Sequence, residues 1–88
     1  MYSIGFSNTA FKDLEKLEGQ IYLRISDKIN SLEINPRPTG AIKLTDVDAY
    51  RVRVGNFRII YSIDDKSYNI VIYRILHRKK DVYKKDYH

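Results

Sequence analysis

The most constraining feature of this chain is an alternating stretch, residues 50–63, interrupted once by Gly55 and Asn56. Two such residues between runs of period two are typical of a β-hairpin, and a Gly-Asn loop favours a type II′ turn. A loop of fixed length also fixes the register of the two strands. It places apolar residues opposite one another on one face, in the pairs Tyr50 with Tyr61, Val52 with Ile59, and Val54 with Phe57.

The other face of this hairpin is cationic. The same register places Arg53 directly opposite Arg58, with Arg51 two residues along the strand. Like charges that face each other across a sheet are destabilising, by an amount comparable to the roughly 0.2–1 kcal/mol of a favourable pair. Folding alone does not favour this arrangement, so the pattern indicates a surface for a polyanion. The alternative is that these arginines are solvated charges that keep a sheet edge from aggregating.

The first forty residues have a helical period. Residues 2–6 predict a short strand, and Ser7 or Asn8 is suited to cap a following helix that ends near Gly19. A second helix is expected from about Gln20 to Asn35, where Pro36 stops it. The apolar stripes that support these helices are Phe11, Leu14 and Leu17 in the first and Tyr22, Ile25, Ile29 and Leu32 in the second.

Strands dominate the second half of the chain. Residues 41–44 predict a short strand, and residues 68–76 predict a strand that is apolar on both faces, as a doubly covered central strand is. Its register is open by one residue, so the face of Arg74 is undecided by sequence. We therefore expect one domain, residues 1–88, with an α+β fold. An N-terminal strand and a helical hairpin pack on a small, mostly antiparallel sheet, in the order β-α-α-β-β-β with room for one more strand.

Charge is unevenly divided along the chain. Residues 49–88 hold ten Lys or Arg against four Asp or Glu, whereas residues 1–48 hold six against seven. A basic half of this kind suggests a surface for nucleic acid or for an acidic protein, with ordinary solubilising charge as the alternative.

Composition removes several classes of function. With no Cys and two His, we expect no disulfide, no thiolate catalysis, no metal site and no cofactor. No apolar run approaches the roughly 20 residues that span a bilayer, and the N-terminus does not read as a signal peptide. A cytoplasmic protein without membrane contact is expected.

Further candidate residues follow the last strand. His77 is suited to move a proton near neutral pH, although a lone histidine is more often structural. Arg78, Lys79 and Lys80 follow the strand end, where binding residues are common, but such a run is otherwise a solvated face. Tyr83 either stacks on an unpaired base or docks the end of the chain on the core.

Two blocks of sequence resemble the RelE/ParE superfamily of toxins from toxin-antitoxin modules, in its RelE-like branch. They are YRVRVGNFRIIY at residues 50–61 and RILHRKKDVY at residues 74–83, preceded by Lys43-Leu44. The resemblance implies a RelE-like fold and a type II toxin that acts as a ribosome-dependent mRNA endoribonuclease, or mRNA interferase. Such a toxin enters the ribosomal A site, inhibits translation by cutting messenger RNA, and is held in check by a small acidic antitoxin from the adjacent gene.

The resemblance also implies roles for individual residues. Arg58 corresponds to an arginine that stabilises the scissile phosphate, and Arg78 to one that assists the leaving group or the transition state. Tyr83 corresponds to a tyrosine that orients or stacks on the substrate, whereas His77 stands where other members have lysine or glycine. The residues expected to bind RNA phosphates are Lys43, Arg51, Arg53, Lys79 and Lys80.

This chemistry needs no metal, because the RNA 2′-OH attacks the adjacent phosphate while fixed guanidinium groups stabilise the charge that develops. The general base is unassigned, since the acids nearest in sequence are Asp46 and Asp48, in a predicted turn. Two alternatives stay open: a ParE-like toxin that inhibits DNA gyrase, and a non-catalytic RNA-binding member of the same fold.

Overall fold

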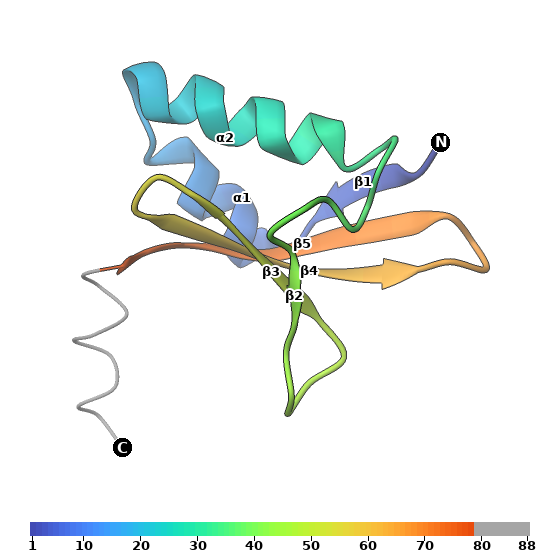
Figure 1. Ribbon diagram of the computed structural model, residues 1–88. Helices are drawn as coiled ribbons and strands as arrows, with labels where there is room; N and C mark the ends of the chain where they lie inside the picture. Colours follow the sequence, from blue (N-terminus) through green and yellow to red (C-terminus); the bar gives the residue numbers. More distant parts are fainter. Residues whose placement is uncertain (79–88) are drawn as a thin grey trace.

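The computed structural model describes residues 1–78, in which two helices cover one face of a five-stranded sheet (Figure 1). The strand order is β1-β5-β4-β3-β2; β1 is parallel to β5 and every other pair is antiparallel. The predicted α+β fold is confirmed. No helix within these residues is long and apolar enough to cross a membrane. The elements are β1 (Ser3–Phe6), α1 (Asn8–Glu15), α2 (Gly19–Ser31), β2 (Ile42–Lys43), β3 (Tyr50–Val54), β4 (Phe57–Asp64) and β5 (Asn69–His77).

Helix α1 begins where the sequence predicts. The Ala10 backbone N–H donates to the Ser7 side-chain oxygen at 3.0 Å, which satisfies one of the free donors of the first turn. The stripe that faces the sheet differs from the prediction, because Ala10 is fully buried whereas Phe11 is 53% exposed. Leu14 and Leu17 pack against the core as expected.

Helix α2 is shorter than predicted. Gly19 has a φ of +63°, consistent with the expected break, but the helix ends at Ser31. The next residues form three-residue turns, in which Glu33 N donates to Asn30 O at 3.1 Å. The buried Tyr61 hydroxyl donates to the Pro36 carbonyl at 2.7 Å and ties this connection to the sheet. The apolar stripe is buried at Ile25, Ile29 and Leu32, but Tyr22 is 40% exposed.

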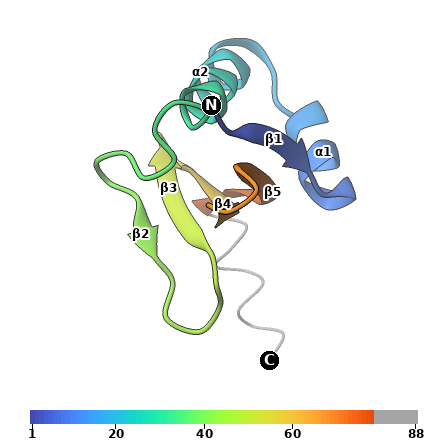
Figure 2. The same cartoon turned by 90° about the vertical axis from the view of Figure 1, so that its right-hand side faces the viewer.

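The hairpin of β3 and β4 has the predicted register, with every predicted pair in place. Gly55 has a φ of +58° and Asn56 does not share this conformation, which is the pattern of a type II′ turn. Val52, Ile59 and Tyr61 therefore point beneath the helices and form the centre of the core. Burying each such side chain stabilises the fold by roughly 1.5–3 kcal/mol. In the turned view, α2 lies above the sheet (Figure 2).

Strand β5 contains an irregularity in its pairing with β4, at the strand whose register the sequence left undecided by one residue. Ile60 pairs with Arg74 but Tyr61 pairs with Ile72, so Tyr73 is an extra residue that forms a β-bulge. The double coverage predicted for this strand holds for one face only. Ile70 and Ile72 are buried beneath the helices, whereas Val71 on the other face is half-buried. That second face of the sheet, which we call the open face, carries no helix within residues 1–78 (Figure 1).

Candidate nucleic-acid interface

The open face gathers four arginines, from β3, from β4 and from the residue that follows β5. Because Val52, Val54 and Ile59 are buried on the helix side, their neighbours in the alternating strands turn outward. Arg53 is paired with Arg58 across the hairpin, and the Arg78 backbone N–H donates to Asn56 O at 2.8 Å, which ties the end of β5 to the hairpin loop. We refer to these residues as the arginine cluster: Arg51, Arg53, Arg58 and Arg78.

Arg58 lies within reach of the charges of the other three arginines. Burial lowers the pKa of Arg58 below its usual range, and the neighbouring charges of Arg51, Arg53 and Arg78 lower it further. Arg58 is half-buried and Arg53 is exposed. A partly desolvated guanidinium among other cations is stabilised by an anion, and its fixed fork of donors suits phosphate oxygens.

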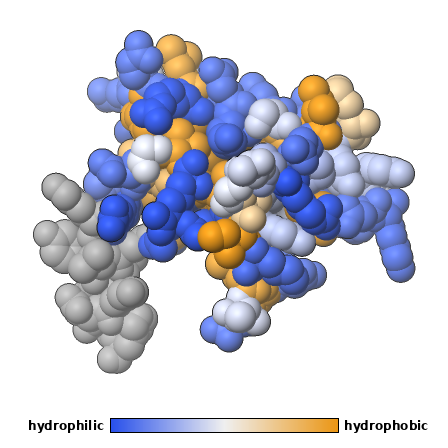
Figure 3. Space-filling view, viewed as in Figure 1, coloured by the Kyte–Doolittle hydropathy of each residue, from blue (hydrophilic) through white to orange (hydrophobic). Residues whose placement is uncertain are grey.

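Two further cations join this surface from α2. Arg24 and Lys28 line a groove between α2 and the hairpin together with Arg53. In Figure 3, hydrophilic side chains lie over the hairpin and the adjoining end of α2, around a strip of apolar surface. The sequence reasoning missed both residues, although their spacing of four on one helix was a usable signal that they share a face.

Lys43 lies apart from the arginine cluster. It pairs with Tyr50, whose side chain belongs to the opposite face of the sheet from Arg51 and Arg53. Its ammonium group binds the Asp48 carboxylate at 2.9 Å and lies 5.4 Å from the centre of the Tyr50 ring. The structure therefore does not bring this predicted phosphate ligand to the other cations.

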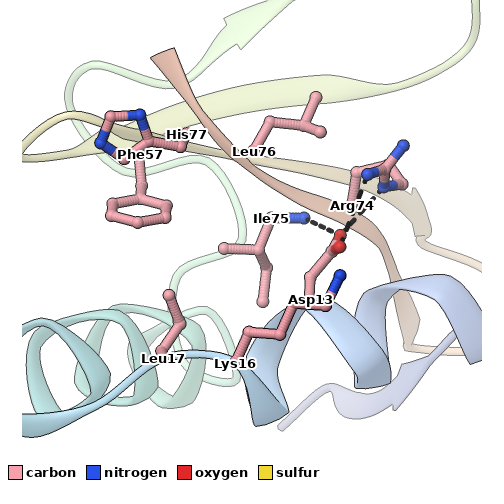
Figure 4. A pocket seen from close by; sticks show the side chains of 8 residues that line it. All are labelled: Asp13, Lys16, Leu17, Phe57, Arg74, Ile75, Leu76 and His77. Atoms are coloured by element: carbon pink, nitrogen blue, oxygen red, sulfur yellow. Dashed lines mark hydrogen bonds and ion pairs between the residues drawn. The ribbon is translucent and has the colours of Figure 1, made fainter. Parts of the chain in front are cut away.

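His77 also lies away from the cluster. It pairs with Phe57, and the two rings meet edge to face with centres 4.8 Å apart. His77 lines a pocket beside α1, together with Asp13 and Leu17 (Figure 4). Strand alternation places it on the same side as Ile75, which is buried beneath the helices. The remaining predicted site residues, Lys79, Lys80 and Tyr83, lie outside the residues that the structure describes.

The neighbouring acids Asp64 and Asp65 both have structural partners. Asp64 accepts hydrogen bonds from the backbone N–H groups of Lys66 and Ser67, as expected for Asp in a turn. Asp65 accepts from Tyr2 at 2.6 Å and forms an ion pair with Arg37 at 2.8 Å. Over residues 1–78, no three His, Asp or Glu side chains gather as metal ligands would.

Comparison with known proteins decides the family. The family model described as the ParE toxin of type II toxin-antitoxin systems, parDE, matches residues 4–82. The chain belongs to the RelE/ParE toxin superfamily. It is a RelE-like toxin of a type II toxin-antitoxin module.

Individual relatives agree with this placement. The RelE-like toxin is similar to the toxin RelG of Mycobacterium tuberculosis, with 30% identity over 86 residues, covering 96% of this chain and 98% of RelG. It is also similar to a chain of the toxin-antitoxin complex RelBE2 from the same organism, with a TM-score of 0.77 and 30% identity, covering 88% and 98% of the two chains. The isolated Escherichia coli RelE toxin shares the fold, with a TM-score of 0.78, 16% identity, and coverage of 97% and 98%.

Proposed function

We propose that this RelE-like toxin is an mRNA interferase, a ribosome-dependent endoribonuclease that cuts messenger RNA in the ribosomal A site and so inhibits translation. The observation that carries the proposal is the arginine cluster on the open face, with one of its guanidinium groups partly desolvated. The sheet fixes the backbone positions from which these side chains extend, so little reorganisation is needed for them to stabilise a developing negative charge.

The proposed reaction is an internal transfer within the RNA. The 2′-oxygen attacks the adjacent phosphorus and loses its proton, while the bond from phosphorus to the 5′-oxygen breaks. The departing 5′-oxygen takes up a proton, and the products are a 2′,3′-cyclic phosphate and a free 5′-OH. The pentacoordinate phosphorus carries additional negative charge in the transition state, which guanidinium groups stabilise more strongly than they stabilise the starting phosphate.

Each residue of the site has a proposed role. Arg58, central and half-buried, contacts the scissile phosphate, and Arg78 stabilises the leaving oxygen. Tyr83 orients the substrate, whereas His77, beside Phe57 on the other face of the sheet, is given no role in the reaction. The residues proposed to bind flanking phosphates are Arg51, Arg53, Lys79 and Lys80. Lys43, bound to Asp48 on the other face of the sheet, is given no role in this site.

Primer extension on a translated messenger tests the proposal directly. Purified wild-type toxin should cut ribosome-bound messenger, and Arg58→Ala should lower the rate by about 100-fold or more, the loss typical of removing one transition-state donor. Lys12→Ala is the matched control, because it removes one exposed positive charge from α1, on the opposite side of the sheet. Equal cleavage by wild type and Arg58→Ala would refute the role of Arg58. Binding of RNA without any cleavage would favour the non-catalytic alternative.

The proposed partner is a small acidic antitoxin, and the proposed location is the cytoplasm. The solved relative from M. tuberculosis is itself a toxin-antitoxin complex. Charge complementarity supports an acidic segment over the arginine cluster, where it would compete with RNA. Co-expression with the product of the adjacent gene should yield a stable complex that neither binds nor cuts RNA. A free toxin after co-expression would contradict this part of the proposal.

A second candidate function, inhibition of DNA gyrase, is favoured by one observation, since the matching family model is that of the ParE toxin. A supercoiling assay with purified gyrase separates the two. Inhibition that survives Arg58→Ala would favour the gyrase candidate, whereas unaffected supercoiling would remove it.

A further inference from the structure

The β-bulge in β5 decides which face of the sheet receives Arg78. Before the bulge Ile72 faces the helices, and after it Ile75 does, because Tyr73 is one residue too many for simple alternation. Without that extra residue in the pairing, alternation from Ile72 would turn residues 74, 76 and 78 toward the helices. A shift of one residue moves every later side chain to the other face. The bulge therefore places Arg78 beside Arg58 on the open face.

Helix α1 holds this bulge at both of its ends. The Ser7 hydroxyl donates to the Tyr73 carbonyl at 2.9 Å. Near the other end of the helix, one oxygen of the Asp13 carboxylate accepts from Arg74 Nε at 2.9 Å and from the Ile75 backbone N–H at 2.9 Å (Figure 4). These contacts join residues more than sixty positions apart in the chain.

Asp13 supplies an acceptor that the sheet does not. Strand β1 ends at Phe6, which pairs with Ile72, so Ile75 lies beyond the end of that neighbouring strand. The Asp13 side chain is only 11% exposed and the Arg74 side chain 34%, so their ion pair is largely sheltered from water. Breaking a sheltered pair by removing one partner is strongly unfavourable, because the other charge is left without compensation.

We propose that Asp13 is a positioning residue that fixes the bulge. It thereby sets the phase of the last residues of β5, that is, which face of the sheet each of them points to. Its effect on cleavage rests on the proposed function. Its effect on strand phase does not, because phase is measured on the free protein. In this view Asp13 holds Arg78 in the arginine cluster from the opposite face of the sheet, without touching RNA.

Amide exchange and nuclear Overhauser contacts in the full chain test the phase. In Asp13→Ala, exchange at the Arg78 amide should accelerate by at least tenfold more than exchange at Ile59, as the end of β5 leaves the hairpin. Leu14→Ala is the control: Leu14 lies next to Asp13 on α1 and packs on the core, so it should loosen the whole sheet evenly. Asp13→Asn, which keeps an oxygen that accepts from Ile75, should fall between wild type and Asp13→Ala.

Kinetics tests the consequence. Asp13→Ala should lower kcat on ribosome-bound messenger by about 10–100-fold relative to Leu14→Ala, the loss typical of a small misplacement of a reacting group, with KM nearly unchanged. Deleting Tyr73 removes the extra residue, so regular pairing then places Arg78 correctly, and Asp13→Ala in that background should have little further effect.

Two outcomes would overturn the inference: Arg78 exchange in Asp13→Ala that matches Leu14→Ala, or a kcat loss of equal size with and without Tyr73. If wild type itself does not cleave RNA, the proposed function fails while the exchange experiment still decides the role of Asp13.

Discussion

Replacing Arg53 by glutamine should stabilise the toxin while weakening its proposed hold on RNA. Arg53 lies directly opposite Arg58 in the hairpin, and Arg51 and Arg78 are also close to Arg58. Removing one of two facing like charges should raise the free energy of unfolding by about 0.5 kcal/mol, within the roughly 0.2–1 kcal/mol range of cross-strand pairs. For a chain of 88 residues this corresponds to a rise in Tm of about 2–4 °C.

Salt dependence separates this effect from a change in packing. The Debye length falls from about 10 Å at 0.1 M salt to about 3 Å at 1 M, so the gain from Arg53→Gln should fade over that range. If Arg53 contacts one phosphate, the same variant should reduce the salt slope of single-stranded RNA affinity by about 0.7. Thermal melts and RNA titrations at several salt concentrations measure both quantities.

Arg37→Gln is the matched control, because it also removes one positive charge. Arg37 binds Asp65 at 2.8 Å and donates to the Tyr50 hydroxyl at 3.1 Å, so its loss should lower Tm and leave RNA binding intact. The reasoning would be refuted if Arg53→Gln lowered Tm at low salt as Arg37→Gln does, or if its gain persisted unchanged at 1 M salt.

Three further predictions concern the fold. Burial raises the pKa of Tyr61 to about 12, so its contribution to stability is complete below pH 10 and is lost as pH rises from about 10 to 12. Tyr61→Phe leaves the Pro36 carbonyl without its donor and should lower the free energy of unfolding by about 1–3 kcal/mol at pH 7. Measured by urea unfolding, this difference from wild type should become smaller above pH 10. Gly55→Ala should cost about 1 kcal/mol or more, since φ is +58° and the added Cβ lies 3.4 Å from the Arg24 guanidinium; its Tm should fall below that of Asn56→Ala. The hydrogen bond from Arg37, aided by that from Tyr2, holds the pKa of Asp65 below its usual range; this stability is present at neutral pH and is lost as pH falls through that lowered pKa. As pH is lowered, the free energy of unfolding of Asp65→Asn should therefore fall less steeply than that of wild type.

Local sequence was sufficient for the hairpin and its charge pattern. The two-residue loop at Gly55 and Asn56 sets the register, and alternation then puts Val52 and Ile59 inside and Arg53 outside. Ser7 likewise marks the start of α1, because capping depends only on the neighbouring backbone. These features involve residues close together in the chain, so pattern alone predicted them, and with them three of the four arginines in the cluster: Arg51, Arg53 and Arg58.

Only the tertiary structure decided which side of α1 is buried and which way the last residues of β5 face. Whether Ala10 or Phe11 faces the sheet depends on how closely α1 packs on β5, which helical period does not encode. The end of β5 depends on contacts from Asp13, about sixty residues earlier in the chain. These contacts hold a bulge that the local sequence pattern does not predict. That bulge sends Arg78 to the open face and leaves His77 beside Phe57 on the other. A one-residue change of phase reverses every following side chain, so long-range contacts settle what composition and spacing leave undetermined.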